Sequence, residues 1–138
     1  MQDKYYAVLD TNVLVSAILG ASRMSIPTKV LKAVTEEKLV PLYNDEIIDE
    51  YREVLLRKKF HFDPELIETV LSTIVTDGIY MDRTKSIEEI FPDPKDIVFY
   101  EVSLSKEGSY LVTGNIKHFP QKSFVITPAE MVRLLEEI

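Results

Sequence analysis

The chain contains no cysteine and only 4 glycines among its 138 residues. Without cysteine, disulfide bridges, thiolate zinc sites and cysteine nucleophiles are all excluded. The longest apolar stretch, residues 13–19, includes a serine and is much shorter than a membrane-spanning helix requires. The first residues also lack the basic region and long apolar core of a signal peptide. We therefore expect a cytoplasmic protein that makes no membrane contact.

Positive charge is also scarce. The sequence has 16 Lys and Arg residues against 23 Asp and Glu, which gives a net charge of −7. This balance argues against a protein that coats nucleic acid, since phosphate binding needs an excess of Lys and Arg. It does not exclude a nuclease whose metal ion supplies positive charge locally. Hydrophobic residues at 46% and charged residues at 28% are typical of one globular domain, spanning 1–138.

Apolar runs that favour strands alternate with amphipathic stretches that favour helices along the whole chain. Several of the runs are almost continuously apolar, which suits strands that are covered on both faces. Alternation of this kind predicts an α/β fold, with a parallel sheet, right-handed crossovers and helices on both sides. The predicted strands are residues 5–9, 39–43, 79–81, 110–113 and 123–126.

Two of the predicted helices have clear start signals. Asp63 followed by Pro64 is typical of an N-cap and first helical position, and Gly78 is placed to end that helix. Thr127 and Glu130 form a capping box around another proline. We expect the helix after Asp63 to bury its apolar side chains, namely Leu66, Ile67, Val70, Leu71, Ile74 and Val75.

Four polar positions follow predicted strands in a way that suggests a shared site. Asp10 ends the first strand, and Glu50 lies about two turns into the helix after the second. Asp96 lies in the first turn of the helix after the third strand, and Asn115 just past the fourth. In a parallel sheet these positions belong to one edge, where ligands bind at the topological switch point. Carboxylates gathered there would need a hard divalent cation, which can activate water against a phosphodiester.

Each of these side chains also has a structural explanation. Asp10 could cap the next helix, although Asn12 could cap it equally well. Asp93 suits an N-cap before a proline, which places Asp96 at the third helical position, where a carboxylate favours the helix dipole. We interpret Asp93 as structural and Asp96 as the ligand. Asn115 could be an ordinary turn residue.

Glu50 competes with other acids on its own helix. Helical spacing places Glu50 on the border of the buried face, whereas Asp49 and Glu53 point away from it. Glu50 is thus the acid best placed to reach a crevice, although a solvated flank would explain it too. The buried face consists of Ile47, Ile48, Tyr51, Val54 and Leu55.

The basic residues give weaker signals. Residues 57–59 form the densest basic patch together with Arg52, and cations there suit a helix C-terminus. Arg52 flanks the buried face, and Lys117 and His118 lie near the proposed edge, so these three are candidates for RNA contacts. Neither His61 nor His118 has a partner motif that would make it a catalytic base for Ser or Cys.

Taken together, these stretches resemble the PIN domain, a family of small metal-dependent ribonucleases. Four motifs carry the resemblance, in order and over essentially the whole chain. Each contains one of the four polar positions, and only Asn115 departs from the family, which usually has Asp there. The motifs are residues 8–17 around Asp10-Thr11-Asn12, residues 49–55 with Glu50, residues 93–96 with Asp96, and residues 112–115 with Thr113 and Asn115.

The resemblance implies a three-layer α/β/α fold with a five-stranded parallel sheet in the order 3-2-1-4-5. It implies an endoribonuclease with Mg²⁺ or Mn²⁺ held by Asp10 and Asp96. Glu50 and Asn115 would complete the metal site, with Asp10, Glu50 and Asp96 as the catalytic acids. Thr11, Asn12 and Thr113 would support them. An amide at position 115 can still bind a hard cation but brings no charge, which puts a second metal ion in doubt.

Residues 112–120 resemble a prokaryotic PIN subfamily classed as toxin components of toxin–antitoxin pairs. This implies RNA as substrate, an antitoxin protein as partner and a homo-oligomer. Two alternatives stay open. One is an inactive PIN module that binds RNA or protein, for which Asn115 is the main support. The other is a phosphate-handling enzyme or receiver-like domain phosphorylated on Asp10, although the chain lacks the companion acids that such an aspartate usually has.

Overall fold

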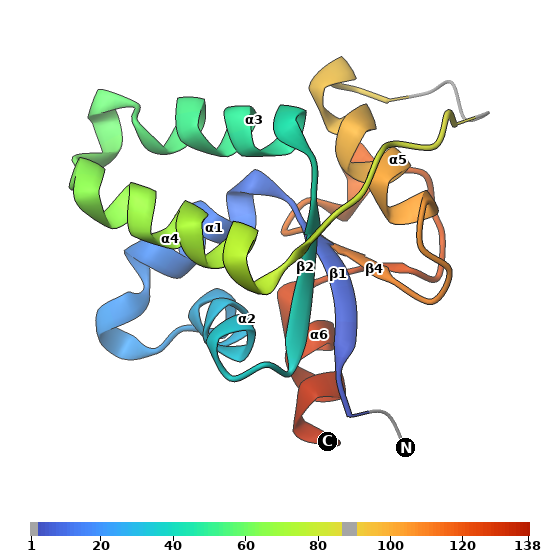
Figure 1. Cartoon of the computed structure of the whole chain (residues 1–138), viewed down its shortest axis with the longest axis horizontal. Coiled ribbons are helices and arrows are strands. Elements are labelled where there is room, and N and C mark those ends of the chain that lie inside the picture. Colours follow the sequence, from blue (N-terminus) through green and yellow to red (C-terminus); the bar gives the residue numbers. More distant parts are fainter. Residues whose placement is uncertain (1–2, 87–90) are drawn as a thin grey trace.

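A computed structural model describes residues 3–86 and 91–138, and these form a five-stranded parallel sheet flanked by helices (Figure 1). The strand order is β3-β2-β1-β4-β5, and every neighbouring pair is parallel. This confirms the predicted fold class and strand order. The strands are β1 (Tyr5–Leu9), β2 (Leu39–Tyr43), β3 (Ile79–Tyr80), β4 (Tyr110–Val112) and β5 (Val125–Ile126).

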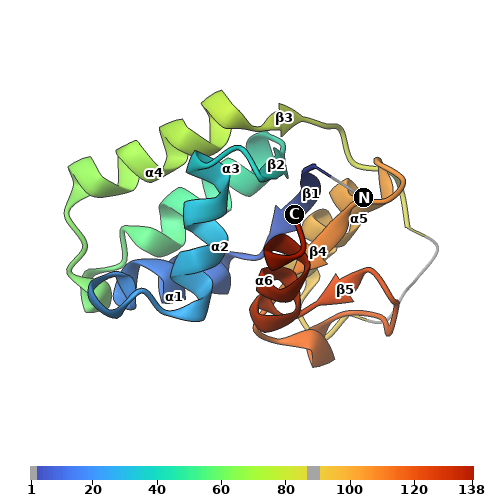
Figure 2. The same cartoon turned by 90° about the horizontal axis from the view of Figure 1, so that it is seen from below.

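Helices cover both faces of the sheet. Figure 2 shows α2 and α6 on one side and α5 on the other. No helix in the described part of the chain is long and apolar enough to cross a membrane. The helices are α1 (Thr11–Leu19), α2 (Ile26–Thr35), α3 (Asp45–Leu55), α4 (Pro64–Asp77), α5 (Ile97–Leu104) and α6 (Pro128–Glu136), with 3₁₀ turns η1 (Ala21–Arg23), η2 (Lys58–Phe60), η3 (Pro94–Asp96) and η4 (Ile116–His118).

The switch point of the sheet lies between β1 and β4. β1 pairs with β2 on one side and with β4 on the other, where Leu9 lies level with Val112. The backbone N–H of Asp10 continues this ladder by donating to the carbonyl of Val112 over 2.9 Å. The residues that follow β1 and β4 are thereby held next to each other at one edge of the sheet.

Most predicted boundaries agree with the structure. Strands β1 and β2 have the predicted bounds, whereas β3, β4 and β5 are one or two residues shorter than predicted. The caps at Asp63 and Thr127 are confirmed, including the capping box. Two of the side chains expected to be buried on α4 are not: Leu66 and Val75 are each 43% exposed. They flank the α4 stripe that faces the sheet and α3, at the exposed side of the helix.

The segment before α5 differs from the prediction. Asp93 does accept a capping hydrogen bond, from the backbone N–H of Lys95 over 3.0 Å, but it caps the 3₁₀ turn η3. Asp96 is therefore the N-cap residue of α5 and not its third residue. The tighter 3₁₀ turn arises where Pro94 begins the segment, and it leaves the Asp96 side chain without a capping hydrogen bond.

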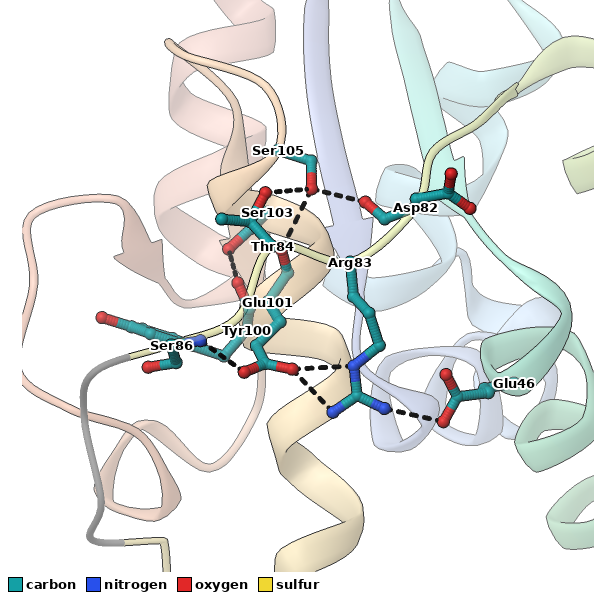
Figure 3. A network of polar contacts seen from close by, with 9 residues as sticks. All are labelled: Glu46, Asp82, Arg83, Thr84, Ser86, Tyr100, Glu101, Ser103 and Ser105. Atoms are coloured by element: carbon teal, nitrogen blue, oxygen red, sulfur yellow. Dashed lines mark hydrogen bonds and ion pairs between the residues drawn. The ribbon is translucent and has the colours of Figure 1, made fainter.

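A polar network connects α3 and α5, the two helices beside the site (Figure 3). Arg83, in the segment after β3, binds the carboxylate of Glu46 on α3 at 2.8 Å and that of Glu101 on α5 at 2.7 Å. The side chain of Glu101 is only 8% exposed and also accepts from the backbone N–H of Ser86. Arg83 thus neutralises a buried acid and fixes the spacing of the helices that carry Glu50 and Asp96.

Candidate functional site

Asp10 is held rigidly at the carboxyl end of β1. One carboxylate oxygen, Oδ1, accepts from the backbone N–H of Thr11 at 2.8 Å, so that Asp10 caps α1. The other, Oδ2, accepts from the hydroxyl of Thr113 at 2.8 Å and from Nδ2 of Asn12 at 3.2 Å. Thr113 is fully buried behind Asp10. The backbone of Thr11 and the side chains of Asn12 and Thr113 therefore all orient this carboxylate.

Burial dominates the charge state of Asp10. The residue is 6% exposed, and this desolvation raises its pKa even though the hydrogen bonds from Thr113 and Thr11 favour the ionised form. Its backbone is anchored from α3, where the hydroxyl of Tyr51 donates to the carbonyl of Leu9. Tyr51 itself is fully buried, and its pKa is raised first by burial and then by the charge of Asp10. The end of β1 is thus fixed on both sides.

Asp96 is the acid that the site leaves least satisfied. Its side chain is 16% exposed, and Oδ2 lies 3.4 Å from Nδ1 of His118. Among the residues that the structure describes, Oδ2 is buried and has no hydrogen-bond partner of good geometry. Burial, and then the charges of Asp10 and Asp93, raise the pKa of Asp96 to about 6. The charge of Asp10 thus disfavours the ionised form of Asp96.

Glu50 and Asn115 are more exposed than Asp10. Glu50 projects from α3 and is partly exposed; burial raises its pKa, and the nearby charge of Lys95 opposes that rise. Asn115 is exposed, and its backbone N–H donates to the hydroxyl of Thr113 over 2.9 Å. Its side-chain nitrogen lies 3.0 Å from Nε2 of His118. Asn115 therefore contacts Thr113, which donates to Asp10, and also His118, which lies beside Asp96.

One pocket of about 310 Å³ collects the predicted acids. Asp10, Glu50, Asp96 and Asn115 all line it, together with Thr11, Asn12 and His118. The rest of the lining was not predicted from the sequence and consists of Val15, Ser16, Val54, Phe60 and Phe99.

Arg52 and Lys117, two of the three predicted RNA contacts, do not line this pocket. The guanidinium of Arg52 faces α4, where Nε and Nη2 bind the two oxygens of Glu68 at 3.1 and 3.2 Å. Lys117 lies exposed in η4, beside His118. Of the three candidates, only His118 lines the pocket. Phe60 had a detectable signal, since it follows two lysines in an alternation of basic and aromatic residues.

The donor atoms of the pocket decide whether a metal ion fits it. Within residues 3–86 and 91–138, no three acidic or histidine side chains are placed closely enough to hold a metal ion. Two buried oxygens in the pocket lining nevertheless lack a hydrogen-bond partner among the described residues, the hydroxyl of Thr11 and Oδ2 of Asp96. Oxygen donors beside a second carboxylate are what a hard divalent cation binds. These two oxygens, together with the carboxylate of Asp10, are the groups in the pocket lining whose chemistry fits such a cation.

The sequence matches a known protein family. The sequence model of a family described as PIN domain matches residues 6–117, which is most of the chain. The matched region begins in β1 and ends in η4, so it includes Asp10, Glu50, Asp96 and Asn115. No curated protein and no solved structure matches the chain significantly.

Proposed function

The chain belongs to the PIN-domain family, whose members are generally nucleases, and from this premise we propose that it is a divalent-metal-dependent endoribonuclease. The observation that carries the proposal is the pocket at the switch point of the sheet. It brings Asp10, Glu50, Asp96 and Asn115 together, and it leaves a buried oxygen of Asp96 without a hydrogen bond among the described residues. Such an oxygen is a cost to the fold unless a ligand uses it.

The proposed roles follow from how each side chain is held. Asp10 and Asp96 would hold the cation, which when bound neutralises their charges and supplies the Lewis acidity that activates water. Asp10 contributes a fixed orientation, because three donors hold its carboxylate. Glu50 would turn inward from its partly exposed position on α3 to orient water against the phosphate. Asn115 would offer its neutral amide oxygen.

The donor set favours Mg²⁺ or Mn²⁺. All the candidate ligands are carboxylate or amide oxygens, and the chain has no cysteine. His118 is close to Asp96 and Asn115 and would contact the RNA phosphate. Lys117 would add a second cation at this rim. We propose a weaker part for Arg52, because an RNA contact would require it to leave Glu68.

We extend the proposal to a toxin component of a toxin–antitoxin pair that forms a homo-oligomer, on the resemblance of residues 112–120. An antitoxin protein would block the same pocket. A non-catalytic module that binds RNA or protein is the second candidate. It is favoured by Asn115 at the usual acidic position and by the incomplete ligand set among the described residues.

The test is cleavage of single-stranded RNA with Mn²⁺ by Asp10→Asn. Asparagine also caps helices well, so α1 and the fold should survive the change. Loss of one charged ligand should reduce the cleavage rate by at least about a hundredfold. Asp49→Asn removes an exposed acid that points away from the pocket and should cleave like wild type. If Asp10→Asn cleaves as fast as wild type, or if wild type shows no Mn²⁺-dependent cleavage, the proposal is wrong.

A further inference from the structure

Two phenylalanine rings form a stacked pair, and one of them, Phe60, lines the pocket. The centroids of Phe60 and Phe62 lie 5.3 Å apart, and their planes differ by 9°. Between them His61 adopts a left-handed backbone conformation with φ of 55°, which residues other than glycine rarely do. This turn places the two rings side by side. The backbone of the segment after α3 therefore sets the stacked arrangement of the two rings.

The two rings have different surroundings. Phe62 packs against the hydrophobic core, whereas Phe60 does not belong to that core or its packing shell as far as the chain is described. Phe60 instead lines the pocket that contains Asp10, Glu50 and Asp96. A ring that contributed only to stability would be expected in the core. Here Phe62 packs against the core, and the ring of Phe60 stacks on Phe62 where it lines the pocket.

The pair follows a short basic run in the chain. Arg57, Lys58 and Lys59 precede it directly and are all exposed. Nζ of Lys59 lies 5.1 Å from the centre of the Phe60 ring. Arg57 pairs with Glu53 at 3.5 Å, but neither Lys58 nor Lys59 has a carboxylate within salt-bridge distance among the described residues. In a chain of net charge −7, this is a local cationic rim beside an acidic pocket.

We infer that Phe60, supported by Phe62, is a stacking platform for an unpaired RNA base next to the scissile phosphate, with Lys58 and Lys59 contacting the flanking phosphates. This inference rests on the proposed function and adds a binding site to it. Aromatic rings combined with a basic track are how proteins hold single strands without sequence preference. The Lys59 ammonium is exposed and flexible, so a base can take its place over the ring while the ammonium moves to a phosphate.

The inference predicts a dependence on unpaired bases. Every base has a π-face, so the platform should accept any of the four. It should not accept a duplex, whose bases are already stacked on one another. A protein partner that inserts into the pocket would also contact Phe60, but it would give no dependence on the bases of an added RNA.

The absence of tryptophan from the chain gives a direct measurement. Phe60→Trp introduces a single indole at the platform, and its fluorescence should be quenched when a short single-stranded RNA binds in the presence of Ca²⁺. RNA integrity is checked by gel at the end of each titration. An oligonucleotide of the same length without bases should bind without quenching. Tyr80→Trp is the matched control, because Tyr80 is exposed, pairs with another aromatic ring and lies outside the pocket lining.

Affinity gives the second measurement. Phe60→Ala and Phe60→Leu should each weaken RNA binding by roughly 5- to 150-fold, the range for losing one base stack. Phe60→Tyr should restore binding. Because Phe60 lies outside the core, the melting temperatures of these variants should stay close to that of wild type. In cleavage assays KM should rise while kcat changes little, since the catalytic acids are untouched.

The possible failures are distinguishable. If wild type binds and cleaves RNA but Phe60→Trp is not quenched and Phe60→Ala binds equally well, the platform is wrong and the proposed function stands. Stacking would also be overturned if Phe60→Ala weakened RNA binding while Phe60→Leu bound RNA as tightly as wild type, because leucine has no π-face. If wild type neither binds nor cleaves RNA, the proposed function itself is wrong.

Discussion

At the scale of single residues, Asp96 has the most consequential charge. Its pKa of about 6 in the folded chain lies above the ordinary value of 3.8. Between these two values the folded state binds more protons than the unfolded state, so stability falls as pH rises through this window. The loss of folding stability is complete at neutral pH, where Asp96 is ionised in the pocket that also contains Asp10. A bound cation would remove it.

We therefore expect Asp96→Asn to stabilise the metal-free protein. In EDTA at about pH 7.5, its melting temperature should exceed that of wild type by a few degrees, since the amide carries no charge to bury. The difference should shrink as pH falls towards about 4, where Asp96 of wild type is protonated. Calorimetry at several pH values measures both effects. A variant less stable than wild type at neutral pH would show that the ionised Asp96 is satisfied within the fold.

The same experiment with metal separates Asp96 from Asp93. Asp96→Asn should lose most of the increase in melting temperature that Mn²⁺ gives to wild type, because ligand binding stabilises only the folded state. Asp93→Ser keeps a capping oxygen for the N–H of Lys95 and should retain that increase. Should Asp93→Ser lose the response while Asp96→Asn keeps it, the cap and the ligand have been assigned the wrong way round.

Asn115→Asp restores the residue that the family usually has. Without metal, the added charge near Asp10 and Asp96 should lower stability near neutral pH, although His118 beside it offers partial compensation. With Mn²⁺ the new carboxylate becomes a ligand, so the metal-induced increase in melting temperature should be larger than for wild type. Cleavage should be equal or faster. An unchanged response to metal would place residue 115 outside the metal site.

At the scale of secondary-structure elements, the position of the helices depends on Arg83. The guanidinium joins Glu46 of α3 to the buried Glu101 of α5. Arg83→Met would leave Glu101 without its cation, and removing one partner of a buried ion pair usually costs about 3–5 kcal/mol. Because the Arg83 side chain is 37% exposed, we expect a smaller loss of about 2 kcal/mol in the free energy of unfolding.

Urea denaturation measures this loss, with Arg57→Met as the control. Arg57 pairs with Glu53 on the surface of α3, and both side chains are about half exposed, so its loss should change stability by about 0.5 kcal/mol or less. Adding Glu101→Gln to Arg83→Met should recover part of the stability by removing the buried charge. Equal effects of Arg83→Met and Arg57→Met would mean that the network contributes no more than a surface pair.

At the scale of the whole molecule, the net charge of −7 limits how RNA can be held. We expect contacts to about three phosphates, mainly through Lys58, Lys59 and Lys117, which corresponds to a slope of about −2 in log affinity against log salt for a single strand. Raising the salt from about 50 to about 200 mM should then weaken binding roughly 20-fold. Fluorescence anisotropy at several salt concentrations measures the slope.

Replacing Lys58 and Lys59 by Ala should reduce that slope to about −0.7, because two of the phosphate contacts are lost. Lys29→Ala combined with Lys32→Ala is the matched control, since both lie on α2 away from the pocket lining. If the control lowers the slope and the Lys58 and Lys59 variant does not, RNA binds another face of the molecule.

The sequence by itself determined the features that depend on near neighbours. Apolar runs located the five strands that the structure describes, and the caps at Asp63 and Thr127 are where local hydrogen-bonding chemistry predicts them. The border position of Glu50 on α3 also follows from helical spacing. These features are predictable because each involves residues within one or two turns. Gly78 ends α4, as predicted. A Cβ at this position would lie 2.4 Å from the carbonyl oxygen of Pro41 in β2, and this contact does not involve near neighbours in the sequence.

Only the tertiary structure decided which of these residues meet. Thr113 donates to Asp10 across 103 positions of sequence, and this contact exists because β1 and β4 are neighbours in the sheet. The engagement of Arg52 by Glu68 and the exposure of Leu66 depend in the same way on how α3 and α4 pack. Phe60 reaches the pocket through a turn that periodicity does not encode. Strand order and helix packing are long-range properties. The sequence motifs therefore identify the candidate acids, but they do not give the burial and the neighbouring side chains that set the pKa of each acid.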